Sequence, residues 1–156
     1  MQIKKLPVQW GPEATSAYWI NRASRALLRL HESRLRPIGF GMSHLPVLMA
    51  LEDGVARSQK ELAERARIEQ PSMTEMLTRM ERDGVIEREP NPEDKRGSLV
   101  TLTRRSRARL PKAKAALLQG EDEAMASFTS DERALLLRLL QRVVTNIEVN
   151  PPTRNG

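Results

Sequence analysis

The chain has 156 residues, enough for one domain with a hydrophobic core, and a formal net charge of +6. It contains no cysteine, which excludes disulfides, thiolate metal sites and cysteine-based redox sensing. Aromatic residues make up only 3% of the chain, which argues against stacking platforms for single-stranded nucleic acid, while the positive charge does not distinguish a nucleic acid from a membrane surface.

The first twelve residues predict an extended N-terminal arm, because prolines and a glycine interrupt any periodic pattern. Two interpretations remain open: a loosely held terminus, or an arm that crosses onto a partner subunit and buries Leu6, Val8 and Trp10. The start is too short and too polar for a signal peptide, and no apolar run has membrane-spanning length. We therefore expect a cytoplasmic protein that does not enter a membrane.

A long helix is predicted from Glu13 to about Arg36, where Pro37 ends it. Its apolar stripe is wider than a small domain covers, and consists of Tyr18, Trp19, Ala23, Ala26, Leu27 and Leu30. Ser43 is expected to cap a second helix that runs from His44 to about Glu52. Residues 55–57 fit a short strand.

Residues 58–66 carry a strong helix-start signal. Ser58 and Glu61 have the spacing of a capping box, in which each side chain bonds the backbone N–H of the other residue. This predicts a helix from Gln59 to Ala66, and residues 67–70 then break the pattern.

Pro71 is placed at the start of a second short helix, where its missing N–H costs nothing, and Gly84 closes that helix after about Asp83. Its apolar positions follow a helical period and are Met73, Met76, Leu77 and Met80. Its opposite face is polar and consists of Ser72, Thr74, Glu75, Thr78, Arg79 and Arg82. Two short helices joined by a tight turn are typical of a helix-turn-helix.

A hairpin follows, with predicted strands at residues 85–89 and 98–102 and a charged, turn-forming loop at 90–97. A helix-turn-helix followed by such a hairpin is a winged helix, in which the second helix enters a major groove and the wing reaches an adjacent minor groove or the backbone.

Thr103 is predicted to cap a helix that extends to about Ser127, and Pro111 should kink it near Arg107 or end a first short segment. Six cations oppose the helix dipole at its start: Arg104, Arg105, Arg107, Arg109, Lys112 and Lys114. They form either a phosphate-facing surface or a solvated face.

A second capping box, Thr129 to Glu132, predicts a last helix to about Val149, followed by a frayed tail at 150–156. The apolar positions of this helix are Leu135, Leu136, Leu139, Leu140, Val143 and Ile147. The first, fifth and sixth helices carry apolar surface that a winged helix alone does not bury. Terminal helices of this kind usually interleave across a two-fold axis, so we expect a homodimer.

The ordered set of motifs resembles the MarR family of bacterial transcription regulators. The resemblance is carried by residues 70–74, 81–86 and 94–97, by Leu102 and Thr103, and by the flanking segments 45–51 and 131–140, and it spans roughly 14–147. It implies a mainly α fold with a small β-hairpin wing. In that organisation residues 1–12 are an arm, 13–36 and 104–149 are dimerisation helices, 37–103 are the winged helix-turn-helix and 150–156 are a flexible tail.

A dimer of this kind would present two recognition helices to consecutive grooves of a pseudo-palindromic duplex, about 34–36 Å apart. Each expected contact also has another interpretation. Ser72 and Thr74 either cap the helix or touch phosphates and base edges. Glu75 either accepts from a cytosine amine or pairs with Arg79, whose guanidinium suits guanine.

Asp94 and Arg96 resemble the family's Asp-x-Arg pair, which implies an internal ion pair that stiffens the wing and directs Arg96 or Lys95 into a minor groove. The alternative is a solvated, mobile tip. Gly97 is expected to allow the turn. The full set of expected DNA contacts is Ser58, Gln70, Pro71, Ser72, Thr74, Glu75, Thr78, Arg79, Asp94, Lys95 and Arg96.

No catalytic constellation or phosphate loop is visible, so we expect no enzymatic activity, no cofactor and no metal site. Members of the family bind small molecules, often aromatic acids or phenols, between the dimer body and the winged helix. The candidates for such a pocket are Trp19, Arg22, His31, His44 and Met49, for which ordinary packing or solvation is the alternative.

The expected function is that of a sequence-specific regulator that binds double-stranded DNA, a repressor released by a small effector such as an aromatic acid or a phenol. The alternative is a winged helix that binds another protein. Between Arg57 and Arg109 there are thirteen basic and ten acidic residues, so charge does not decide between the two, whereas the order of the elements favours DNA.

Overall fold

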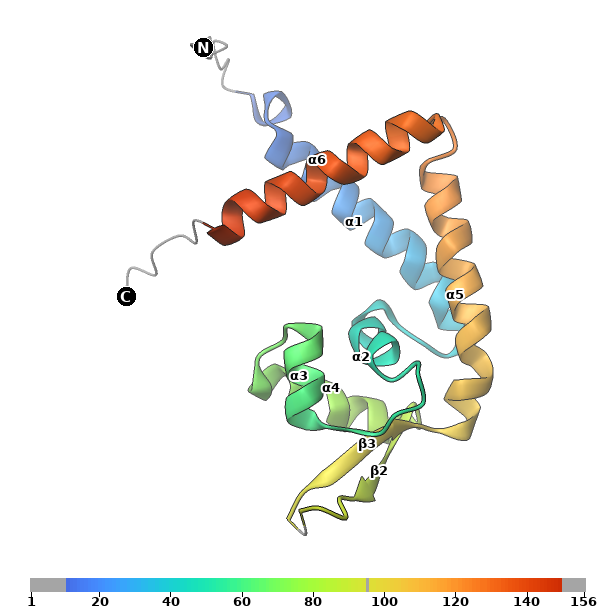
Figure 1. Cartoon of the computed structure of the whole chain (residues 1–156). Helices are drawn as coiled ribbons and strands as arrows, with labels where there is room; N and C mark the ends of the chain where they lie inside the picture. The colour runs from blue at the N-terminus through green and yellow to red at the C-terminus, as the bar shows by residue number, and fades with distance from the viewer. Residues whose placement is uncertain (1–10, 95, 150–156) are drawn as a thin grey trace. The chain divides into compact units, whose positions relative to one another are not determined.

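The computed structural model describes residues 11–94 and 96–149, and its contacts divide the chain into two units, residues 1–120 and 121–156. Most of the N-terminal arm, Lys95 and the C-terminal tail lie outside the described residues. The main elements are α1 (Ser16–Leu35), α2 (Leu45–Ala50), β1 (Arg57–Ser58), α3 (Gln59–Ala66), α4 (Gln70–Arg82), β2 (Ile86–Pro90), β3 (Ser98–Leu102), α5 (Arg104–Ala124) and α6 (Ser130–Val149) (Figure 1). The predicted fold, mainly helical with a small sheet, is confirmed.

Helix α1 begins three residues later than the predicted Glu13. Thr15 is its N-cap, and the Thr15 Oγ1 accepts a hydrogen bond from the N–H of Tyr18 at 3.3 Å. A 3-10 turn, Pro12–Ala14, precedes it, and a second, Arg36–Ile38, follows it and contains the predicted stop at Pro37.

The start of α2 differs from the prediction that Ser43 caps it. A 3-10 turn, Met42–His44, leads into the helix, so Ser43 lies inside the helical segment rather than before it. The cap comes from α1 instead: the Oε2 of Glu32 accepts from the N–H of Met42 at 2.7 Å. This bond lowers the pKa of Glu32, because it stabilises the charged carboxylate. The helix ends at Ala50, two residues before the predicted Glu52.

The sheet is antiparallel with the strand order β1-β3-β2. Ile86 pairs with Leu102 and Pro90 with Ser98, and Arg57 pairs with Val100 on the other edge of β3. The predicted third strand therefore exists, shifted to Arg57–Ser58. Figure 1 shows the β2–β3 hairpin extending beyond the helices that pack at its base.

Of the two outcomes expected at Pro111, a kink or the end of a first short segment, the second is wrong, because helix α5 runs through Pro111 without ending. Thr103 is its start, as predicted: the Thr103 Oγ1 accepts from the N–H of Ser106 at 3.2 Å. Pro111 has no N–H for the carbonyl of Arg107, but Leu110 and Ala113 beside it are buried, and this packing holds the helix together. The helix ends at Ala124 rather than near Ser127.

One hydrophobic cluster contains residues of the winged helix together with residues of α1 and α5. It includes Leu62, Met73, Leu77 and Met80 from the helix-turn-helix, and Val85, Ile86, Val100 and Leu102 from the hairpin. Leu35 from α1 and Leu110 and Ala113 from α5 belong to the same cluster. The core of the predicted DNA-binding region thus takes residues from helices that the sequence assigns to dimerisation.

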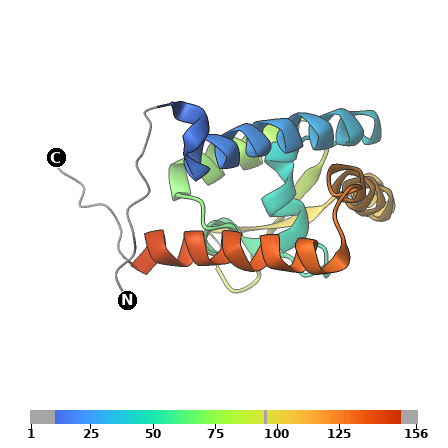
Figure 2. The same cartoon turned by 90° about the horizontal axis from the view of Figure 1, so that it is seen from above.

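In the second unit, α6 begins at the predicted capping box. The N–H of Thr129 donates to the Glu132 Oε2 at 2.8 Å, and the N–H of Glu132 donates to the Thr129 Oγ1 at 3.3 Å. Arg133 holds the loop before the helix by bonding Asp122 Oδ1 at 3.0 Å and the carbonyl of Met125 at 2.9 Å. Both views show α6 as one uninterrupted helix (Figure 1 and Figure 2). No helix within the described ranges combines the length and apolarity that a membrane span requires.

Candidate nucleic-acid interface

The capping box at Ser58 builds the first helix of the helix-turn-helix. The Ser58 Oγ accepts from the N–H of Glu61 at 3.3 Å, and the Glu61 Oε2 accepts from the Ser58 N–H at 2.8 Å. Bonds from the side chain and backbone of Ser58 lower the pKa of Glu61. Ser58, an expected DNA contact, therefore already uses its hydroxyl in capping α3.

The turn between α3 and α4 is closed by Arg67, whose φ of 53° places it in the left-handed region. The N–H of Ile68 bonds the carbonyl of Ala63 at 3.0 Å across this turn. Glu69 is then extended and forms the N-cap position of α4, so Pro71 lies in the first turn of that helix, as predicted. Neither Ser72 nor Thr74 is the cap.

Helix α4 buries its apolar face and exposes the polar face that the sequence predicts. Met73, Leu77 and Met80 are 0% exposed and belong to the core. Ser72, Thr74, Glu75, Thr78, Arg79 and Arg82 are all exposed. The helix ends at Arg82, and Gly84, with a φ of 69°, supplies the left-handed residue, while the Val85 N–H bonds the Met80 carbonyl at 2.8 Å. No ion pair joins Glu75 to Arg79, both of which the structure describes.

A hydrogen-bond chain links α3 to the outer face of α4. The Gln59 Nε2 donates to the Thr74 Oγ1 at 2.7 Å and lies 3.4 Å from the Gln70 Oε1. The Thr74 Oγ1 in turn donates to the backbone carbonyl of Gln70 at 2.9 Å. Sequence periodicity did not single out Gln59, because at the first position of α3 it fits an ordinary exposed helix residue.

The wing tip is organised by a turn at Asp94, and no ion pair joins Asp94 to Arg96, both of which the structure describes. The Oδ1 of Asp94 accepts from the backbone N–H of Arg96 at 2.9 Å, and the carbonyl of Asp94 accepts from the N–H of Gly97 at 3.0 Å. The expected pairing of the Asp94 carboxylate with the Arg96 guanidinium is replaced by this turn. The Arg96 side chain is exposed, and Lys95 lies outside the described residues.

Gly97 is required in the turn because it has no side chain, and not because its backbone is left-handed. A Cβ at this position would lie 3.1 Å from the Asp94 Oδ2, so any larger residue would press on the carboxylate that shapes the turn. The sequence prediction that Gly97 belongs to the turn is correct, with this steric reason.

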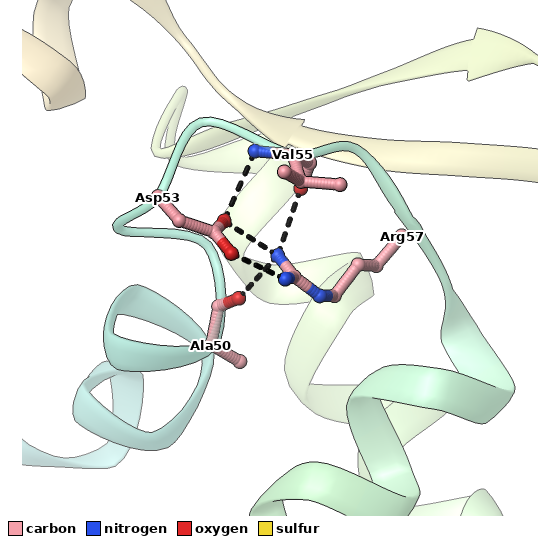
Figure 3. A network of polar contacts seen from close by, with 4 residues as sticks. All are labelled: Ala50, Asp53, Val55 and Arg57. Carbon is pink, nitrogen blue, oxygen red and sulfur yellow. Dashed lines mark hydrogen bonds and ion pairs between the residues drawn. The ribbon is translucent and has the colours of Figure 1, made fainter.

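A buried arginine ties the sheet to α2. Arg57 is only 5% exposed, and its Nη1 donates to the carbonyl of Ala50 at 2.6 Å and to that of Val55 at 3.0 Å. The same guanidinium grips Asp53 with both nitrogens, at 2.7 Å from Nη1 to Oδ1, and all of these bonds are visible in Figure 3. The pair holds the pKa of Asp53 well below its usual range and raises that of Arg57. The loop between α2 and β1 is therefore closed around one guanidinium.

A second arginine ties the wing to the recognition helix. The Nε of Arg88, on β2, lies 3.0 Å from the Glu81 Oε2, on the last turn of α4. The Nη1 of Arg88 also bonds the Ser98 Oγ across the hairpin at 3.5 Å. Arg88 thus connects both strands of the wing with the helix that would enter the major groove.

The six cations at the start of α5 divide into two groups. Arg107 bonds the Thr101 Oγ1 at 3.2 Å, Arg109 bonds the carbonyl of Ile38 at 3.4 Å, and Lys114 pairs with Glu52. The other three, Arg104, Arg105 and Lys112, are exposed and have no such bond to another described residue. Half of the expected basic surface is therefore used within the protein.

The five candidate ligand residues do not gather around one cavity. Arg22 lies 5.6 Å from the ring centre of Trp19 and bonds the Tyr18 hydroxyl, on exposed positions of α1. Met49 lines a surface hollow of about 450 Å³ with Pro46, Ala50, Arg65 and Ala66.

The two histidines lie elsewhere. His31 faces Gly120 of α5, and the His44 Nδ1 accepts from the N–H of Gly41 at 3.2 Å. A second hollow, about 510 Å³, contains none of the five and is lined by Leu28, Arg29, Glu32, Ser33, Arg36 and Met42.

The fold that carries this exposed polar helix and the wing beside it is matched by known proteins. The family model described as the MarR family matches residues 42–98, which span α2 to the start of β3. The chain is 28% identical over 122 residues to the HTH-type transcriptional regulator YwoH of Bacillus subtilis (strain 168), covering 78% of this chain and 88% of that protein. The HTH-type transcriptional regulator YdgJ of the same Bacillus subtilis strain is 32% identical over 109 residues, covering 70% of this chain and 66% of that protein. The chain belongs to the MarR family.

Solved structures of transcription regulators extend the match to most of the chain. A mutant of MarR from E. coli, complexed with operator DNA, superposes with a TM-score of 0.73 at 29% identity, covering 81% of this chain and 91% of that one. The transcriptional repressor CouR, bound to a 23-mer DNA duplex, gives a TM-score of 0.74 at 26% identity, covering 85% of this chain and 94% of that one. The protein is thus a MarR-family transcriptional regulator.

Proposed function

We propose that this MarR-family protein is a sequence-specific repressor that binds double-stranded operator DNA through α4 and the wing. The observation that carries the proposal is the exposed polar face of α4, with its buried apolar face fixed in the core and the wing tied to its last turn by Arg88 and Glu81. The likeness to two proteins whose structures contain DNA supports it. In this proposal Arg79 reads a guanine and Arg96 enters the minor groove.

The protein acts as a homodimer in this proposal. None of the described residues of α6 is buried, and its apolar side chains are left exposed, including Leu137 at 59% and Ile147 at 58%. Helix α1 likewise exposes Trp19 at 52% and Leu28 at 48%. Apolar surface of this extent is stabilised when a second copy covers it, and a two-fold dimer presents two copies of α4 to a pseudo-palindromic site.

A small aromatic or phenolic effector would release the repressor by changing the separation of the two recognition helices. The hollow beside α1 is lined in part by Arg29 and Arg36, and the one beside α2 in part by Arg65, so that a cation is available in each for an aromatic acid. The protein would act in the cytoplasm, where bacterial DNA is transcribed.

The test combines two measurements on the purified protein. Light scattering gives the oligomeric state, and fluorescence anisotropy gives the affinity for the duplex upstream of its own coding region and for a random duplex, at low and moderate salt. We expect a dimer, a steep salt dependence and at least a thousandfold preference, roughly, for the specific site. A monomer that binds both duplexes equally would contradict the proposal and favour a winged helix that binds protein. Phenolic acids added to the complex test release.

A further inference from the structure

Two threonine hydroxyls on the outer face of α4 already donate their protons within the protein. A threonine hydroxyl has one proton to donate and two lone pairs that accept. The proton of Thr74 goes to the backbone carbonyl of Gln70, at 2.9 Å, and one of its lone pairs accepts from the Gln59 Nε2, at 2.7 Å. One lone pair remains, so the exposed hydroxyl of Thr74 can accept one further hydrogen bond and has none to donate.

Thr78, one turn further along the same face, is in the same state. Its Oγ1 donates to the backbone carbonyl of Thr74 at 2.8 Å, which leaves only lone pairs facing outward. Glu75 lies between the two threonines and is exposed, and a carboxylate only accepts. Three neighbouring polar side chains of the recognition helix therefore present acceptors, while Arg79 presents donors.

Acceptors on a protein select donors on DNA. In the major groove the only base donors are the N4 amino group of cytosine and the N6 amino group of adenine, whereas guanine N7 and O6 and thymine O4 are acceptors. Phosphate oxygens are acceptors as well, so Thr74, Glu75 and Thr78 are poorly suited to hold the DNA backbone. Their hydrogen-bonding state suits them to base edges.

We infer that Thr74, Glu75 and Thr78 read exocyclic amino groups of adenine or cytosine in the major groove, and that Gln59 is a positioning residue that orients Thr74 for this task. The inference rests on the proposed function, which it deepens by naming the chemistry of the base pairs that are read. Gln59 acts across the turn: it comes from the first position of α3 and fixes a hydroxyl on α4.

The test begins by selecting tight-binding duplexes from a random pool with the full-length protein. In the selected duplex, each adenine is replaced by purine and each cytosine by pyrimidin-2-one, both of which lack the exocyclic amino group. The wild type and the Thr74→Val variant, which keeps the side-chain shape without the hydroxyl, are measured on each duplex. For each protein, the loss of affinity on removal of the amino group is measured. Dividing the wild-type loss by the Thr74→Val loss cancels the effect of the weakened base pair, because both proteins bind the same duplexes.

We expect removal of at least one amino group to weaken wild-type binding by about tenfold and to leave the binding of Thr74→Val nearly unchanged. Thr74→Ser should restore the sensitivity. Gln59→Met should reduce discrimination at the same base pair without changing the salt slope, because no charge is lost. Thr78→Val is tested in the same way, against the same set of modified duplexes.

Two results would overturn the inference while leaving the proposed function intact. One is a specific duplex whose binding is insensitive to every amino-group removal. The other is a Thr74→Val effect coupled to 7-deazapurine replacement, which deletes an acceptor and would mean that Thr74 donates. If the pool yields no specific duplex at all, both the proposed function and this inference fail.

Discussion

Arg57 and Asp53 form a two-pronged pair in which the guanidinium is buried and the carboxylate faces solvent, with their side chains 6% and 48% exposed. The same guanidinium donates to the backbone carbonyls of Ala50 and Val55, and so supplies the hydrogen-bond donor that these two carbonyls need.

We predict that Arg57→Met lowers the free energy of unfolding by about 2–3 kcal/mol, because the carbonyls of Ala50 and Val55 lose a charged donor. Asp53→Asn should also destabilise, since it leaves the buried guanidinium with a neutral partner. Urea unfolding of both variants and of the double variant measures the coupling. The double variant should cost less than the sum of the two, and strict additivity would show that the pair does not act as a unit.

A second prediction concerns the contact between α5 and α1. A Cβ added to Gly120 would lie 2.8 Å from the His31 Cδ2 and 3.0 Å from its Nε2, closer than packed atoms approach. Gly120→Ala should therefore destabilise the protein by about 1–3 kcal/mol, more than alanine gains in helix propensity. In the His31→Ala background the same change should be neutral or stabilising. Thermal unfolding decides, and a stabilising Gly120→Ala in both backgrounds would contradict the contact.

A third prediction follows from His44, which is half-buried and whose Nδ1 accepts from the Gly41 N–H. Burial lowers the pKa of His44 below its ordinary 6.5, with Arg79 contributing in the same direction and Asp83 and Glu32 opposing it. Between the folded and unfolded pKa values the unfolded chain binds more protons. The contribution of His44 to stability is therefore present above about pH 6.5 and is lost as the pH falls through the folded pKa.

An NMR titration of the imidazole protons should show His44 titrating below 6.5. The His44→Asn variant keeps an acceptor for Gly41 without titrating, so its unfolding free energy should fall less between pH 7 and pH 5, roughly the window in which histidine titrates. Equal pH dependence of variant and wild type would remove His44 as the source.

A fourth prediction separates the wing from the recognition helix. Arg96→Ala should weaken binding to every duplex and lower the salt slope by about one, because one cation that neutralises DNA phosphate charge is lost. Arg79→Ala should instead relax discrimination at one base pair, by about 1–3 kcal/mol. Arg25→Ala, on an exposed position of α1, is the control for lost charge. An Arg96→Ala salt slope equal to that of the Arg25→Ala control would place Arg96 outside the interface.

The sequence by itself determined the elements whose signals are local. The capping boxes at Ser58 and Thr129, the proline in the first turn of α4 and the glycine after it each act within one turn of helix, so they are readable without knowing what packs nearby. The helical period of apolar and polar residues on α4 is equally local and led to the helix-turn-helix, while the turn-rich hairpin after it led to the wing.

The tertiary structure alone decided which polar groups are already engaged. In the sequence Arg57 fits a strand residue, but in the structure its guanidinium is buried and bonds the carbonyl of Ala50. Arg109 and Lys114 fit free cations in the sequence. In the structure they bond Ile38 and Glu52, each more than sixty positions away in the chain. Pro111 stays inside α5 because the core holds Leu110 and Ala113 on either side. Gln59 reaches Thr74 only because the turn at Arg67 folds α3 against α4. A hydrogen bond between distant residues depends on where the backbone brings them, and no local pattern carries that information.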